Sequence, residues 1–134
     1  MIAAHHPLKD RGETSLQTVV LVPVVFLIVF MCFHVGAIFH NTHVAELAAL
    51  RGAAVASGLS PSSDTQQRAI SEVQRVAADL NSTLLGSPSV SFRHDGVHVT
   101  VRLKVAGPVS FLPKTATAKV WTPWETFKQE QDRS

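Results

Sequence analysis

The feature that most constrains this chain is a long apolar run with no formally charged side chain, from Thr14 to Phe39. As a helix, the roughly 22 residues from Thr18 to Phe39 would extend about 33 Å, and the hydrocarbon core of a bilayer measures about 30 Å. Pro23 would break a helix of a soluble protein, but a spanning helix tolerates it. A helix that is apolar on every face needs a larger protein around it if it is to be buried. The run therefore predicts a transmembrane helix.

A secretory signal peptide is the competing interpretation of this run. Signal peptides have an apolar region of about 7 to 15 residues followed directly by a small-residue cleavage site. Val35-Gly36-Ala37 has the composition of such a site. The run is long, however, and a helical pattern continues beyond it without a break. Release of a small secreted binding domain after Ala37 thus remains the alternative.

The residues that flank the run indicate its orientation. Residues 1–12 form a short polar leader that includes Lys9 and Arg11, whereas on the far side Arg51 is opposed by Glu46. Positive charge is favoured on the cytoplasmic side of a membrane. We therefore expect a single-pass protein of the cell membrane with a cytoplasmic N-terminus and an extracytoplasmic C-terminal domain.

After the run, an alanine-rich segment continues in helical pattern as far as residue 57. Two rows of small residues at i, i+4 spacing lie in it: Ala45, Ala49 and Ala53, and Ala48, Gly52 and Ala56. Such rows let another helix approach closely. Alanine also favours helix on its own account. The segment is predicted to form a helical stalk with these residues as helix-packing positions.

A second helix is predicted beyond Gly58. Ser63 and Gln66 have the spacing of a capping box. The apolar residues that recur at helical spacing after them are Ile70, Val73, Ala77, Leu80 and Leu84. Charged residues occupy the rest of the wheel, so this helix is amphipathic and has about five turns.

The hydrophobic period then changes from 3.6 to 2. Val90 and Phe92 precede Asp95-Gly96, which suits a tight hairpin turn, and alternating apolar residues follow from Val97 to Val105. Ala116, Ala118 and Val120 indicate a third strand. A hairpin alone is marginal, so the amphipathic helix is expected to pack on its apolar face.

The predicted fold class is therefore α+β. A transmembrane helix extends into an alanine-rich stalk, and an amphipathic helix packs on a small antiparallel sheet of about three strands. The expected divisions are a cytoplasmic leader (1–12), a transmembrane helix with its alanine-rich extension (13–57), a small extracytoplasmic α+β domain (58–121) and a polar tail (122–134).

Composition excludes several kinds of function. The net charge is only +2 and the basic residues are dispersed, so nucleic acid is not an expected partner. Cys32 is the single cysteine, which rules out an intramolecular disulfide and a paired-cysteine metal site. No phosphate-binding loop or nucleophile elbow occurs. We expect neither enzymatic activity nor a cofactor.

Two groups of polar residues have the residue types of a functional site. His40, His43 and Glu46 stand at i, i+3 and i+6, but no spacing supplies the further ligands and supporting shell that a metal site needs. His94, Asp95 and His98 around the hairpin have the positions of turn and surface residues rather than of a catalytic group. We therefore interpret both groups as ordinary polar surface.

The N-terminal part of the sequence resembles the TadE/TadG-like pseudopilins of tight-adherence (Flp type IVb) pilus systems. The resemblance lies in "RGETSLQTVVLVP", in the spanning run, and in "AELAALRGAAVAS", which is similar to that family's alanine-rich AAxxGAxxAA segment. It covers about residues 10–57. It implies a minor pilin that assists assembly of a pilus or related secretion apparatus; an anchored adaptor of another envelope complex is the alternative.

The resemblance also implies roles for particular residues. Gly12 would precede the bond that prepilin peptidase cuts, and Glu13 would begin the mature chain. Gln17 would occupy the fifth mature position, and Pro23 the place of the family's proline.

The family usually has glutamate where Gln17 stands, and this glutamate is thought to face the freed amine of a neighbouring subunit. Glutamine holds a hydrogen bond but cannot neutralise an amine. Either the chain is a low-copy accessory subunit that need not pack in a filament, or Glu13 takes over part of the pairing with the amine, or the resemblance is to a relative that no longer assembles. The implied partners are prepilin peptidase, membrane lipid, and other pilin-like subunits and pilus assembly proteins.

Overall fold

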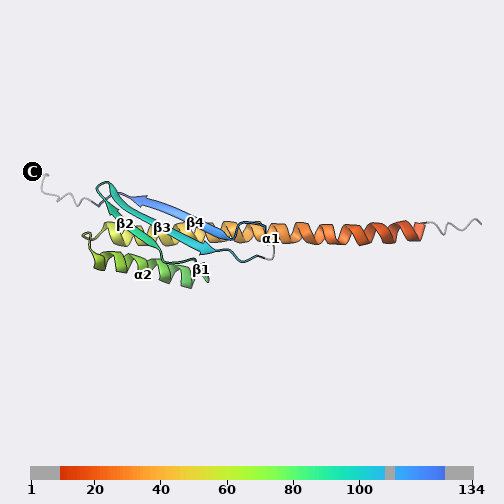
Figure 1. Ribbon diagram of the computed structural model, residues 1–134, viewed down its shortest axis with the longest axis horizontal. Coiled ribbons are helices and arrows are strands. Elements are labelled where there is room, and N and C mark those ends of the chain that lie inside the picture. Colours follow the sequence, from red (N-terminus) through yellow and green to blue (C-terminus); the bar gives the residue numbers. More distant parts are fainter. Residues whose placement is uncertain (1–9, 108–110, 126–134) are drawn as a thin grey trace, which may run out of the picture.

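The computed structural model describes residues 10–107 and 111–125. Among them the elements are α1 (Asp10–Ser57), α2 (Ser63–Asp79), β1 (Thr83–Leu84), β2 (Ser89–Arg93), β3 (Gly96–Lys104) and β4 (Thr115–Thr122). The long apolar helix, the second helix and the antiparallel sheet confirm the α+β class (Figure 1). Most of the predicted leader and of the predicted polar tail lies outside the described residues.

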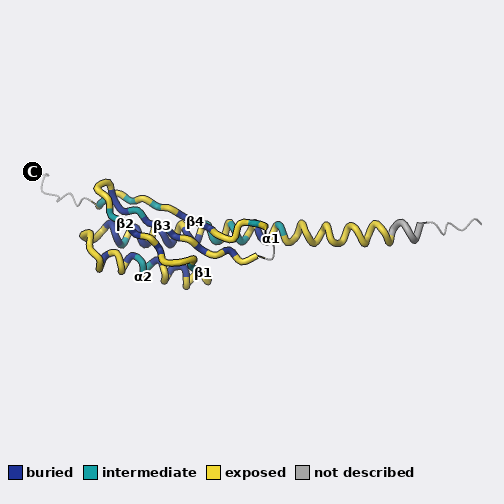
Figure 2. Tube along the Cα trace, viewed as in Figure 1, coloured by how far each residue is buried: buried dark blue, intermediate teal, exposed yellow. Residues whose placement is uncertain are grey.

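Helix α1 is the longest element of the structure, and the other described elements pack along one half of it (Figure 1). Its 48 residues correspond to about 72 Å of helix. It continues through Pro23. The part nearer the N-terminus projects from the domain and is exposed along its length, whereas the part nearer Ser57 lies within the domain (Figures 1 and 2).

The N-cap of helix α2 lies one residue earlier than predicted. The hydroxyl of Ser62 accepts a hydrogen bond from the backbone amide of Thr65 at 3.1 Å, so Ser62 is the N-cap. The predicted capping box of Ser63 and Gln66 is therefore wrong. The side-chain amide of Gln66 instead donates to the carbonyl oxygen of Val90 at 3.0 Å, which ties the helix to β2.

Helix α2 also ends earlier than its apolar spacing indicated. It stops at Asp79, and Asn81 takes a left-handed backbone conformation with φ of 54°. Asparagine adopts this conformation more readily than most residues. Leu80 is consequently exposed, and Leu84 belongs to β1 rather than to the buried side of the helix.

The sheet is antiparallel and is centred on β3. Strand β4 pairs with one edge of β3, from Val97↔Thr122 to Lys104↔Thr115. Strands β2 and β1 pair in succession with the other edge. The prediction of about three strands missed only β1, whose two residues carry no periodicity. The hairpin turn consists of His94 and Asp95, and Gly96 already pairs with Arg93.

The apolar alternation of β3 is confirmed. Its buried side consists of Val97, Val99, Val101 and Leu103, with Val105 just beyond the strand. This face packs mainly against α1, whereas α2 packs mainly against α1 and reaches the sheet at β1 and β2. Alanine on α1 leaves room for both layers to approach the helix closely.

The folded domain consequently includes the second half of α1. His34 is the first fully buried residue of the helix, and the core continues through Val44 and the alanine rows. We expected a domain beginning at residue 58 and a separate stalk before it. The difference arises because the small residues of the supposed stalk provide the surface on which α2 and the sheet pack.

Candidate membrane anchor and processing site

No other part of the described chain packs around the N-terminal half of α1. From Ser15 to Phe33, a stretch of 19 residues that we call the exposed segment, all residues are exposed except half-buried Met31. It measures about 28 Å as a helix, close to the thickness of a bilayer's hydrocarbon core of about 30 Å. Because no part of the described domain covers it, this helix is a candidate membrane anchor. Exposure is continuous only as far as Phe33, but Val35, Gly36 and Phe39 are still exposed up to the expected limit at Phe39.

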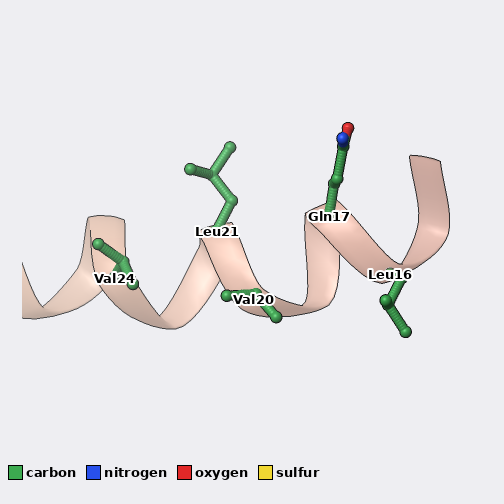
Figure 3. A pocket seen from close by; sticks show the side chains of 5 residues that line it. All are labelled: Leu16, Gln17, Val20, Leu21 and Val24. Atoms are coloured by element: carbon green, nitrogen blue, oxygen red, sulfur yellow. The ribbon is translucent and has the colours of Figure 1, made fainter. Parts of the chain in front are cut away.

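Two residues singled out from the sequence lie in the exposed segment. Gln17 shares an open groove with the apolar side chains around it, Leu16, Val20, Leu21 and Val24. Gln17 and Leu21 project from the same side of the helix, and Leu16 projects from the opposite side (Figure 3). The amide of Gln17 is thus a polar group presented outward on an apolar helix, where it can bond to another helix. Pro23 lies one to two turns further along.

The predicted processing site lies at the beginning of α1. Gly12 and Glu13 are within the first turn of the helix, directly before the exposed segment. Residues 1–9 of the predicted leader are outside the described residues. The bond between Gly12 and Glu13 is therefore on the N-terminal side of the candidate anchor.

The small-residue rows lie in the core of the domain. The alanines of both rows have no exposed surface: Ala45, Ala48, Ala49, Ala53 and Ala56. A Cβ placed on Gly52 would lie 2.6 Å from Cγ2 of Val73 and 3.3 Å from the carbonyl oxygen of Ala69. The close helix contact that these rows favour is thus made with α2 of the same chain.

His34 connects the exposed segment to the domain, and the sequence reasoning missed it. Its side chain is buried, and Nε2 lies 3.2 Å from the carbonyl oxygen of Pro113. A carbonyl only accepts, so Nε2 is the donor of this hydrogen bond. Nδ1 is buried without a hydrogen-bond partner, and the ring packs so closely on Gly107 that a Cβ there would collide with it. A lone histidine in an uncharged apolar run was the signal that could have found it.

Two of the residues considered as metal ligands form a pair on the surface of α1. His43 Nδ1 lies 3.7 Å from Glu46 Oε2, and both side chains are largely exposed, as is His40. Within residues 10–107 and 111–125, no three or more His, Cys, Asp or Glu side chains gather closely enough to hold a metal ion.

The hairpin contains one polar pair. His98 Nε2 lies 3.4 Å from Asp95 Oδ2. Partial desolvation acts to raise the pKa of Asp95, but hydrogen bonds from its own backbone amide and from His98 outweigh it, so the pKa is lowered. A carboxylate that is ionised and exposed beside a turn is consistent with a surface pair.

Comparison with known families gives a match over α1. Residues 12–54 match the family model described as TadE-like protein. The comparisons with curated proteins and with solved structures gave no match. The matched residues run from Gly12 through the exposed segment and into the small-residue rows. Over residues 12–54 this chain is therefore similar to the TadE-like family, in agreement with the resemblance found in the sequence.

Proposed function

We propose that this chain is a membrane-anchored TadE-like minor pilin, or pseudopilin, that assists assembly of a Flp-type tight-adherence pilus or a related secretion apparatus. The observation that carries the proposal is the TadE-like match over residues 12–54, which includes the uncovered apolar half of α1 and continues into the alanine-rich half. The role is structural rather than enzymatic. The charged clusters of the described residues are surface ion pairs, which agrees with such a role.

In this proposal α1 crosses the cell membrane once. The N-terminus is cytoplasmic, since Lys9 and Arg11 precede the exposed segment, and the folded domain is extracytoplasmic. About 28 Å of apolar helix suffices to span the hydrocarbon core with little tilt. The domain then begins at His34, at the surface of the bilayer.

Prepilin peptidase would cut between Gly12 and Glu13 on the cytoplasmic side. Glycine is small enough for a narrow pocket, and the polar residues before Thr18 keep the bond near the interface. Cleavage would leave Gln17 as the fifth residue of the mature chain, with its amide presented outward in lipid. A polar side chain in that position favours a partner helix that can hydrogen-bond to it. Other pilin-like subunits are the partners that this arrangement fits.

The mature terminus tests the processing step. The full chain is expressed with and without prepilin peptidase, extracted from membranes and analysed by mass spectrometry. We expect a chain that starts at Glu13 only when the peptidase is present, and we expect Gly12→Val to block cleavage. Gly36→Val is the matched control, because a Cβ at Gly36 has open space beside the helix. An intact Met1 terminus in the presence of active peptidase would contradict the processing step.

A second experiment tests the assembly role. Pilin-like subunits should co-purify with the chain from detergent extracts, and Gln17→Leu should reduce their recovery while membrane insertion is retained. Leu21→Ile, on the same side of the helix, serves as the control for a change in shape alone. Normal pili in cells that lack the chain would refute a role in assembly.

The alternatives make different demands on α1. Release by signal peptidase after Ala37 would cut a continuous helix next to a side-chain hydrogen bond from Asn41 to the carbonyl oxygen of Ala37, 2.9 Å long. That geometry argues against release. An adaptor of another envelope complex would keep the anchor without the processing site. Neighbouring genes for a prepilin peptidase and a secretion ATPase would favour the pilus.

A further inference from the structure

The connection between β3 and β4 is fastened to α1 at the point where the exposed segment ends. The backbone amide of Val105 donates to the carbonyl oxygen of Lys114 at 2.7 Å, which closes the base of the connection. The carbonyl oxygen of Pro113 accepts from His34, and Gly107 packs on the same ring. Strand β3 runs toward the exposed half of α1 and β4 runs back from it (Figure 1). The described ends of the connection are therefore held against the helix.

This attachment sets the height of the connection relative to the membrane. Phe33 is the last residue of the exposed segment, and His34 is the first that the domain covers. If α1 spans the bilayer, as proposed above, its hydrocarbon part ends close to Phe33. The residues packed on His34 then lie in the headgroup region.

The side chains in this region have the composition of a membrane-interface contact. Phe111 is 76% exposed, more than any other large hydrophobic residue that the structure describes, and half-buried Leu112 follows it. Lys104 precedes these two residues in the sequence and Lys114 follows them. Both lysines are exposed, and no ion pair of the described residues involves them. Apolar side chains beside lysines suit the boundary between acyl chains and anionic phosphates.

We propose that this face, made by Phe111 and Leu112 with Lys104 and Lys114, is a second membrane contact of the chain. Phe111 lies in the boundary between headgroups and acyl chains, and the two lysines face anionic lipid phosphates. The contact is continuous with the surface of α1 that lipid already covers. It makes the bilayer, rather than another protein, the partner of this face. The inference rests on the proposed anchoring of α1 and not on the role in pili.

Site-directed spin labelling of the full chain in lipid vesicles tests the contact. In a Cys32→Ala background, single cysteines are introduced as Phe111→Cys, Val24→Cys and Leu59→Cys. Val24 reports on the middle of the exposed segment, and Leu59 is an exposed apolar residue at the far end of the domain. Each label is probed with oxygen, which concentrates in lipid, and with a water-soluble nickel complex. The vesicles contain phosphatidylcholine alone or with phosphatidylglycerol.

We expect the ratio of oxygen to nickel collisions to be several-fold higher at position 111 than at position 59, and highest at position 24. Phosphatidylglycerol should raise the ratio at 111 further, and the double change Lys104→Gln/Lys114→Gln should abolish that increase. A label at 111 with the collision ratio of the one at 59, or with a spectrum broadened by contact with a second copy, would overturn the proposal. If the label at 24 is still exposed to lipid in that case, the anchoring of α1 stands. A water-exposed label at 24 would overturn both.

Discussion

The contact between α1 and α2 at Gly52 allows a prediction whose sign depends on the background. In Gly52→Ala the new Cβ would lie 2.6 Å from Cγ2 of Val73, whereas carbon atoms in contact are normally about 3.5 to 4.0 Å apart. Relieving this overlap by moving α2 costs about 1 to 3 kcal/mol. Replacing glycine by alanine inside a helix stabilises the helix by about 1 kcal/mol. We therefore expect Gly52→Ala to lower the free energy of unfolding by up to about 2 kcal/mol.

The same substitution should behave differently when Val73 is already alanine. Val73→Ala removes the methyl group that the new Cβ would meet and leaves the carbonyl oxygen of Ala69, 3.3 Å away, as the nearest atom. In that background Gly52→Ala should be neutral or stabilising by up to about 1 kcal/mol. The double-mutant cycle should thus give a favourable coupling of about 1 to 3 kcal/mol.

Urea unfolding of the full chain in detergent micelles provides the measurement. Trp124 is a suitable fluorescent probe because its ring stacks on Phe92 with centroids 5.9 Å apart, so unfolding changes its surroundings. The slope with urea should stay constant across the four variants. Gly36→Ala, where the Cβ has open space, should cause no loss of stability. Equal effects of Gly52→Ala in both backgrounds would refute the close approach of the two helices.

Three further changes test other contacts of the domain. Ser62→Ala should lower the free energy of unfolding by about 1 kcal/mol because it removes the N-cap of α2, whereas Ser63→Ala should change the unfolding midpoint little. A larger loss of stability in Ser63→Ala than in Ser62→Ala would instead support the capping box predicted from the sequence. Gly107→Ala should destabilise the domain by about 1 to 3 kcal/mol, since the new Cβ collides with a buried imidazole, and an unchanged midpoint would place the loop elsewhere. A hydrogen bond from a neighbouring arginine lowers the pKa of Glu72 from 4.5, so its stabilising effect is present above that pH and lost as the pH falls through the lowered value. The melting temperatures of the wild type and Glu72→Gln should accordingly differ at neutral pH and converge in acid.

Periodicity predicted the elements of this fold well. The uncharged run and the alternation from Val97 to Val105 each have a strong pattern, and each gives the expected element. The end of α2 was misjudged because Leu80 and Leu84 continue a helical spacing that the left-handed backbone of Asn81 interrupts. Strand β1 could not be predicted, since two residues have no period and pair only because β3 offers them an open edge.

The candidate site was less accessible to sequence reasoning than the fold. Gly12, Gln17 and Pro23 were singled out through a family resemblance, and the composition of the run alone would not have distinguished them. The small-residue rows predicted a close helix contact, but nothing in their spacing says whether the second helix belongs to the same chain. His34 was missed because its partner, the carbonyl of Pro113, is 79 residues away in the sequence.

Helix α1 passes from the exposed segment into the core of the domain without a linker. The domain and the exposed segment are consequently expected to move together as one rigid body. A tilt of about 10° would displace one end of a 72 Å helix by roughly 12 Å relative to the other, and a rotation of the domain would turn the anchor through the same angle. A protein bound to the outer face of the sheet would thereby also set the direction in which Gln17 faces around the axis of α1.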